Sequence, residues 1–235
     1  MKEHPMLYST PMIRAKLEGR KTQTRRIVKS LLKDLNTEHN LTGVDILNDR
    51  LSAFFDRRIM AQCPYGKVGD VLWSREAWSI SHYEGIDKHP TYLYRADMEG
   101  VKGIWKPSIH QPKVAARIWE RITNIRVERL QDISPHDAGE EGVEYWNIDY
   151  EALQGGELVA DYMNYTWRDD PDYEDYHFPT FGNPIDSYRT LWESINGEGS
   201  WNVNPWVWAI TTEILSTTGR PKELSDELIL NTPER

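Results

Sequence analysis

Hydrophobic and polar positions alternate in several short segments of this chain, which is the pattern of half-buried β-strands. The alternation is clearest at Val71–Trp78, where aliphatic and aromatic residues recur between polar ones. Gly66 and Gly69 favour a turn immediately before this segment. The segments expected to form strands on this basis are 71–78, 92–95, 115–122, 124–130 and 206–215.

Three other segments carry the spacing and the end signals of helices. The first is expected to run from a threonine cap at Thr10 to Gly19, with a proline in its first turn. The second, Ser134–Glu141, begins with a serine followed by a proline and has an acidic residue three positions after the serine. The third, Pro184–Ile195, repeats apolar residues at helical spacing.

The expected strands outnumber the expected helices and do not alternate with them one by one. This order favours an α+β fold, built as a mixed or antiparallel β-barrel with short peripheral helices. A single domain over residues 1–215 is expected, followed by a polar tail at 216–235. Two stretches interrupt the pattern, namely a polar excursion at about 30–58 and an acidic, loop-rich insertion at about 145–182.

Composition narrows the class of protein. The single cysteine, Cys63, excludes a disulfide framework and a multi-cysteine zinc site, and the histidines show no metal-ligand spacing. No metal and no cofactor are therefore expected. No apolar run approaches the roughly 20 residues of a membrane span, and Met1–Pro5 is not followed by the apolar region of a secretory signal. A cytoplasmic protein without membrane contact is expected.

The formal net charge of −9 is distributed unevenly along the chain. Residues 1–130 carry 23 Lys and Arg against 15 Asp and Glu, whereas residues 131–235 carry 5 against 22. The overall acidity argues against general coating of nucleic acid, because such binding depends on neutralising phosphates. Either a local basic site lies in the first half, or the two halves pair with each other or occupy separate solvated faces.

The densest basic stretch begins in the first expected helix and continues beyond it. Seven cations stand there against one acid, Glu18, and they are Arg14, Lys16, Arg20, Lys21, Arg25, Arg26 and Lys29. Together with the hydroxyls of Thr22 and Thr24, these cations suit a phosphate or the polar edge of a base. The alternative is a solvated basic edge that binds nothing.

The same stretch contains the parts of a nucleophilic site. A threonine hydroxyl needs a base, and a lysine supplies one when burial or nearby cations keep its amine neutral. Lys21 and Thr24 are close in sequence, and a carboxylate from Glu140 or Glu141 would complete the site. Residues three apart on a regular strand point to opposite faces, so Lys21 must lie in a turn or the strand must bulge. The alternative for the glutamates is a solvated helix surface.

A second cluster lies in Trp105–Pro112, where two prolines restrict the loop. The side chains that this loop offers to a ligand are Trp105, Lys106, Ser108 and His110. An aromatic ring beside a cation suits stacking and hydrogen bonding to a nucleobase, and a rigid structural loop is the alternative. Arg75 is a further candidate, because it is expected to share a strand face with Trp73.

Several of these motifs together resemble a known family. The run Leu17–Arg26 is similar to the signature of ASCH domains, in which a short helix ends at glycine and continues into Lys-Thr-x-Thr-x-Arg. Further motifs resemble the phage and prophage branch of that family, and they stand at Cys63–Gly66, Gly69–Glu76, Tyr94–Asp97, Trp105–His110 and Val127–Ile133. The resemblance covers about residues 5–143 densely and Trp192–Trp208 more loosely.

The resemblance implies a PUA-like β-barrel with a cleft for a nucleoside, a nucleotide or single-stranded nucleic acid. One small bacterial branch of the family is similar to N(4)-acetylcytidine amidohydrolases, which use a lysine, a threonine and a glutamate. Lys21, Thr24 and Glu141 fall on those positions, with Glu140 as the alternative carboxylate. The implied roles are nucleophile for Thr24, activating base for Lys21, and orienting or proton-transferring carboxylate for Glu141.

The leading hypothesis is therefore an ASCH protein that binds a nucleotide or modified nucleoside and hydrolyses an exocyclic amide. The binding residues expected around the Lys21, Thr24 and Glu141 trio are Arg20, Thr22, Arg25, Arg26, Arg75, Trp105, Lys106, Ser108 and His110. A non-catalytic RNA- or DNA-binding module is the alternative from a different class. A ribonuclease is the third, and no histidine pair or metal-binding carboxylate set in the sequence favours it.

Overall fold

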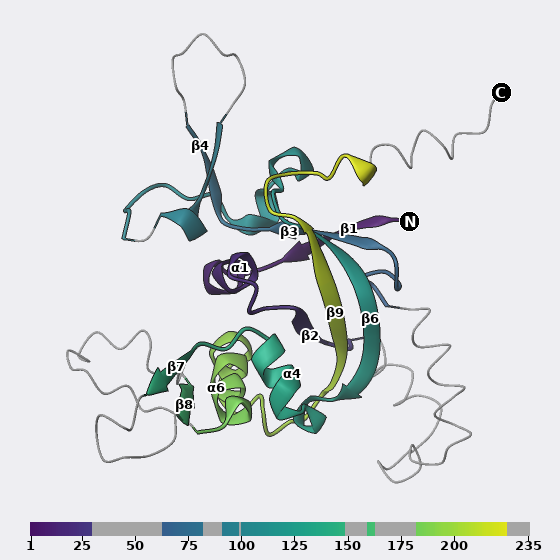
Figure 1. Ribbon diagram of the computed structural model, residues 1–235, viewed down its shortest axis with the longest axis vertical. Helices are drawn as coiled ribbons and strands as arrows, with labels where there is room; N and C mark the ends of the chain where they lie inside the picture. Colours follow the sequence, from purple (N-terminus) through teal and green to yellow (C-terminus); the bar gives the residue numbers. More distant parts are fainter. Residues whose placement is uncertain (30–62, 82–90, 99, 149–158, 163–181, 225–235) are drawn as a thin grey trace, which may run out of the picture. The chain divides into compact units, whose positions relative to one another are not determined.

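The computed structural model describes residues 1–29, 63–81, 91–98, 100–148, 159–162 and 182–224 (Figure 1). These residues form two compact units. The described part of unit 1 is 1–18, 63–81, 91–98, 100–125 and 211–224, and that of unit 2 is 19–29, 126–148, 159–162 and 182–210. The polar excursion expected at 30–58 and most of the insertion expected at 145–182 lie outside the described residues. The single domain expected over 1–215 stays a prediction.

Five strands hydrogen-bond in the order β1-β3-β6-β9-β2. They are β1 (Glu3–Leu7), β2 (Gln23–Ile27), β3 (Val71–Arg75), β6 (Trp119–Arg129) and β9 (Trp206–Ser216). Strand β1 is parallel to β3, and β3 is antiparallel to β6 with Val71 opposite Arg121. This mixed sheet with few helices confirms the α+β class. The strands within the described ranges form no closed barrel, so closure stays a prediction.

The strand expected over 71–78 is two strands. Strand β3 ends at Arg75, and β4 (Trp78–Ser81) pairs instead with β5 (Thr91–Tyr94), placing Trp78 opposite Tyr94. The partners change at Glu76, whose backbone N–H donates to the side-chain oxygen of Gln111 at 2.8 Å. The Gln111 side chain thus accepts the hydrogen bond that a neighbouring strand would otherwise accept. The strand pairing of β3 ends at this point.

Two further expectations are corrected at the edges of strands. The separate strands expected at 115–122 and 124–130 are one strand, β6, which begins only at Trp119. Residues Lys113–Ala115 form a 3₁₀ turn instead. Strand β1, which contains Pro5, is not among the strands expected from the sequence. It is the first strand in the hydrogen-bonding order, an edge position at which the missing N–H of proline is tolerated.

Helix α1 (Thr10–Leu17) is fastened to the sheet of unit 1 by a buried ion pair. Its N-cap is Ser9, so the cap expected at Thr10 is wrong by one residue. The Lys16 ammonium donates to the Glu120 carboxylate at 2.5 Å, and both side chains are almost completely buried. Glu120 also accepts hydrogen bonds from Ser74 and Thr212, which fixes α1 relative to β3, β6 and β9.

The buried apolar cluster of unit 1 extends to the end of the described chain. It contains Val71, Trp73, Ala116, Trp119 and Leu224. Leu224 is 2% exposed although it lies in the stretch expected to be a polar tail. The early part of that stretch therefore contributes to the core of unit 1.

The described part of unit 2 includes α4 (Pro135–Glu140) and α6 (Pro184–Asn196), which lie side by side (Figure 1). The Ser134 hydroxyl accepts from the backbone N–H of Asp137, and this confirms the expected serine cap. The core includes Tyr188, whose ring lies 6.1 Å from that of Trp201. Strands β7 (Tyr145–Ile148) and β8 (Val159–Tyr162) form an antiparallel pair within the expected insertion.

A glycine substitution tests the turn before β3. Gly66 has φ +111°, and an added Cβ would lie 2.9 Å from the His4 ring. Gly66→Ala is expected to lower the free energy of unfolding by about 2–4 kcal/mol, because backbone strain and overpacking act together. Gly69→Ala is the control, since φ is +89° there but the new Cβ would meet nothing within 4 Å. Denaturant unfolding should show the larger loss at Gly66, and equal losses would contradict the expected contact with His4.

Candidate functional site

The first candidate site is a buried pair in unit 2. Lys21 lies just before β2 and forms an isolated antiparallel bridge with Glu141. Its ammonium donates to the Glu141 carboxylate at 2.7 Å, to the Glu141 carbonyl at 2.8 Å and to the Gln23 carbonyl at 2.8 Å. Three acceptors match the three N–H bonds of a charged ammonium. This environment suits a structural cation better than a neutral base.

Arg25 extends this pair into a network of charges. Its guanidinium donates to Glu141 at 3.1 Å, to Glu128 at 2.6 Å and to Asp137 at 3.2 Å. Arg126 donates to Glu128 and Asp137 as well. Burial opposes the charge of Arg25, but Glu141, Tyr188 and Glu128 outweigh it and raise the pKa of Arg25. With Lys21, the network holds three cations and three carboxylates, so it carries no excess charge for a ligand.

Thr24, the expected nucleophile, lies on β2 and is 2% exposed. Its neighbours Gln23 and Arg25 both direct their side chains to Asp137. Side chains alternate between the two faces of a strand, so the Thr24 hydroxyl points to the opposite face of β2. Lys21 lies before the first residue of β2, which is the position expected if Lys21 and Thr24 are to share a site. The structure thus brings Lys21 and Glu141 together and directs Thr24 away from the carboxylates of Asp137 and Glu141.

The other expected residues of this segment also make contacts within unit 2. Arg20 donates to the Gly142 carbonyl at 2.7 Å, beside the end of α4. The Thr22 backbone N–H donates to the Glu140 carbonyl at 2.9 Å, and Arg26 is half-buried on β2. Arg20 and Thr22 therefore hold the start of β2 against the end of α4.

The network makes a prediction about acid stability. Burial alone would raise the pKa of Asp137, but a hydrogen bond from Gln23 and the charges of Arg126 and Arg25 lower it below its ordinary 3.8. The stabilisation from the charged carboxylate is therefore complete above pH 3.8 and is lost as the pH falls through the lower folded pKa. Unfolding measured from pH 6 to 2 should show a shallower acid loss for Asp137→Asn. Identical slopes for both proteins would contradict the depressed pKa.

The remaining expected binding residues lie in unit 1. Lys106 places its ammonium 4.7 Å from the centre of the Trp78 ring. Arg75 lies over the ring of Trp73 and donates to the carbonyl of Ile109. Ser108–His110 forms a 3₁₀ turn. Unit 1 also has a pocket, which is described next. Trp105 lines this pocket, whereas Lys106, Arg75, Ser108 and His110 do not.

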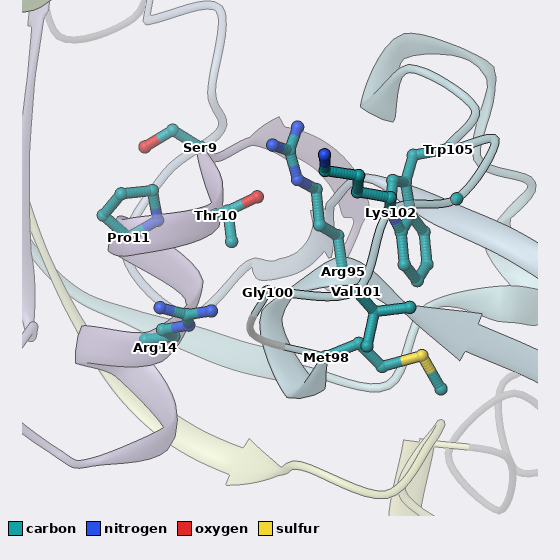
Figure 2. A pocket seen from close by; sticks show the side chains of 11 residues that line it. Ser9, Thr10, Pro11, Arg14, Arg95, Met98, Gly100, Val101, Lys102 and Trp105 are labelled. Atoms are coloured by element: carbon teal, nitrogen blue, oxygen red, sulfur yellow. The ribbon is translucent and has the colours of Figure 1, made fainter. Parts of the chain in front are cut away.

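That pocket is the second candidate site, and Figure 2 shows it from close by. It has a volume of about 920 Å³. The residues that line it are Ser9, Thr10, Pro11, Arg14, Arg95, Met98, Gly100, Val101, Lys102, Gly103 and Trp105. Among these described lining residues, three are cations, namely Arg14, Arg95 and Lys102. In the view of Figure 2 the charged ends of Arg95 and Lys102 both lie away from Met98.

Hydrogen bonds and ion pairs connect the elements on and around this pocket. The Arg14 Nε–H of α1 donates to the Ala96 carbonyl at 3.0 Å, in the 3₁₀ turn Arg95–Asp97. Asp97, the acid nearest in sequence to Arg95, accepts from Arg117 at 2.7 Å. Arg117 also donates to the buried Glu76 at 2.9 Å. Asp97 therefore shares the single positive charge of Arg117 with Glu76.

Sequence reasoning found Trp105 but missed the cations that accompany it. Lys102 lies between Gly100 and Gly103, just before Trp105. A cation in such a glycine-rich loop is the sequence signal from which Lys102 could have been predicted as a binding residue. Arg95 was assigned only to the end of a strand. Arg14 belonged to the basic stretch, but its neighbours on the pocket wall lie more than 80 residues later in the chain.

Other classes of site and the comparisons with known proteins add no assignment. Within the described ranges, no group of three His, Cys, Asp or Glu side chains could hold a metal ion. No helix in the described part of the chain is both long enough and apolar enough to cross a membrane. Comparison of the chain with models of protein families, with curated proteins and with solved structures found no match.

Proposed function

We propose that this chain is an ASCH-type protein with a PUA-like fold that binds a nucleotide, or an exposed nucleotide of a nucleic acid, in the unit 1 pocket. The resemblance of Leu17–Arg26 and the later motifs supports the family, and the mixed α+β sheet is compatible with it. The observation that carries the binding proposal is the lining of the pocket, whose described residues combine the cations Arg95 and Lys102 with the indole of Trp105.

The lining offers a partner for each part of a nucleotide. An indole stacks on any base, because every base has a flat π-face. Guanidinium and ammonium groups form charge-assisted hydrogen bonds with phosphate oxygens. The hydroxyls of Ser9 and Thr10 add polar groups that suit a sugar or a phosphate oxygen. A volume of about 920 Å³ is in the range of small-molecule sites.

Calorimetric titration tests this proposal. The full chain is titrated at low salt with the four nucleoside monophosphates and with a single-stranded pentanucleotide. Saturable binding that weakens as salt is raised is expected, because phosphate contacts release counterions. The absence of saturable binding to all of these ligands would overturn the proposal.

The family resemblance implies a second candidate, hydrolysis of an exocyclic amide, and the contact of 2.7 Å between Lys21 and Glu141 brings two of its three residues together. Its test is the release of acetate from N(4)-acetylcytidine by the wild type, Lys21→Ala and Thr24→Ala. Turnover by the wild type that both substitutions abolish would establish this candidate. Because Lys21 and Thr24 are at most 2% exposed, we expect equally slow turnover in all three proteins.

A further inference from the structure

We infer that Arg117 is a positioning residue of the unit 1 pocket and that it acts on a bound ligand through Asp97. This inference rests on the proposed nucleotide binding and adds two residues to the same site. Arg117 and Asp97 are not among the residues that line the pocket. Arg95, which begins the 3₁₀ turn Arg95–Asp97, and Met98, which follows it, both line the pocket. The role of Arg117 is therefore to hold this turn, and with it the Arg95 side chain, in place.

The Arg117 guanidinium contacts both ends of the turn. Its Nη1–H donates to the Asp97 carboxylate at 2.7 Å. Its central carbon lies 4.1 Å from the centre of the ring of Tyr94, the residue before the turn. The first contact is a charge-assisted hydrogen bond and the second is a cation–π contact. One side chain thus holds the residue before the turn and the last residue within it.

A buried carboxylate fixes the guanidinium itself. Glu76 is 1% exposed and accepts from the Arg117 Nε–H at 2.9 Å and from an Nη2–H at 3.0 Å. The Glu76 backbone N–H donates to the Gln111 side chain, which donates in turn to the Ala115 carbonyl. Burial opposes the charge of Arg117, but hydrogen bonds to Glu76 and Asp97 outweigh it and raise the pKa of Arg117. Arg117 is therefore a charged anchor with a fixed position.

The position of the turn matters because Arg95 reaches the pocket from it. The Arg95 backbone N–H donates to the Ala77 carbonyl at 3.0 Å. Arg14 of α1 donates to the Ala96 carbonyl at 3.0 Å, and Asp97 adds a contact at the third residue of the turn. A binding side chain must be held within about 0.5 Å of its productive position by such supporting contacts. Loss of the Asp97 contact is therefore expected to weaken the contact of Arg95 with an anionic ligand.

Two substitutions of Asp97 separate positioning from charge. Asp97→Asn and Asp97→Ala remove the same negative charge, but asparagine keeps an oxygen that can accept from Arg117, whereas alanine does not. The full chain is titrated with ADP. Asp97→Asn should bind ADP at least as tightly as the wild type, because removal of a negative charge favours an anion. Asp97→Ala should bind ADP about tenfold more weakly than Asp97→Asn, since a hydrogen bond to a charged group contributes about that factor. The Asp97 side chain is 47% exposed, so both variants should melt close to the wild type.

A substitution of Arg117 tests the other end of the contact. Arg117→Lys keeps a positive charge for the buried Glu76, but an ammonium does not span two carboxylates as the guanidinium fork does. This variant should bind ADP about tenfold more weakly than the wild type. Asp97→Ala in the same chain should add little, because both substitutions remove one contact. Arg121→Lys is the matched control, since Arg121 pairs with the exposed Glu213 and does not line the pocket, and its ADP affinity should equal that of the wild type.

The outcomes separate this inference from the proposed function. Equal ADP affinities for Asp97→Asn and Asp97→Ala would overturn the inference and leave nucleotide binding intact. Losses that add in the Arg117→Lys and Asp97→Ala double variant would do the same, because the two residues would then act independently. A wild-type chain without saturable ADP binding would overturn the proposed function and the inference with it.

Discussion

Glu141→Ala is expected to destabilise the protein by about 3–5 kcal/mol, because it leaves buried cations without their carboxylate. Glu141 is 3% exposed and contacts both Lys21 and Arg25. The Lys21 ammonium keeps its two carbonyl acceptors but loses the Glu141 carboxylate, which lies at 2.7 Å. Denaturant unfolding monitored by tryptophan fluorescence measures the change.

Glu140→Ala is the matched control for this prediction. The two glutamates are adjacent, but the Glu140 side chain is 33% exposed and has a contact of 4.0 Å with the exposed His136. Exposed pairs of this kind contribute about 0–1 kcal/mol. The Glu140 carbonyl, which accepts from Thr22, is retained in the variant. Similar losses for both substitutions would show that the Lys21–Glu141 pair is not buried as described.

The double substitution Arg95→Glu and Lys102→Glu is expected to weaken ADP binding by at least about 100-fold. Like charges facing a ligand cost several kcal/mol, and about 1.4 kcal/mol corresponds to a factor of ten. Both side chains are exposed at the pocket and lie outside the buried core, so stability should change little. Calorimetry at constant ionic strength measures the affinity.

A control with the same change in net charge separates the pocket from the overall field of the protein. Lys67→Glu and Arg121→Glu replace two exposed cations of unit 1 that do not line the pocket. Only a small, salt-dependent loss of ADP affinity is expected from that pair. An equal loss from both double variants would mean that net charge, and not the pocket lining, governs binding.

Local sequence signals predicted the elements that depend on local chemistry. The serine–proline start of α4 and the apolar spacing of α6 are visible in the sequence, and both helices form where expected. Strand β9 also has nearly the expected limits. The break after Arg75 was invisible, because it depends on the side chain of Gln111, which is 35 residues away from Glu76 in the chain.

The two candidate sites also differ in whether local sequence signals or contacts between distant residues determine them. The pairing of Lys21 with Glu141 joins the start of β2 to the end of α4. The sequence pattern predicted that helix end, and the family resemblance implied that the two residues share a site. The face of β2 to which the Thr24 side chain points depends on where this five-residue strand begins, because successive side chains alternate between its two faces. The pocket depends on α1 meeting a 3₁₀ turn far along the chain, through the Arg14 contact with Ala96. No local sequence pattern predicts this contact between α1 and the 3₁₀ turn.

Photolabelling tests the proposed nucleotide site most directly. The full chain is irradiated with an azido-purine nucleoside diphosphate, with and without excess ADP, and the labelled peptides are identified by mass spectrometry. The account predicts label within residues 95–105, centred on Trp105 and removed by excess ADP. Label that excess ADP removes from residues 19–29 or 126–142 instead would place the site at the Lys21–Glu141 network and contradict the account.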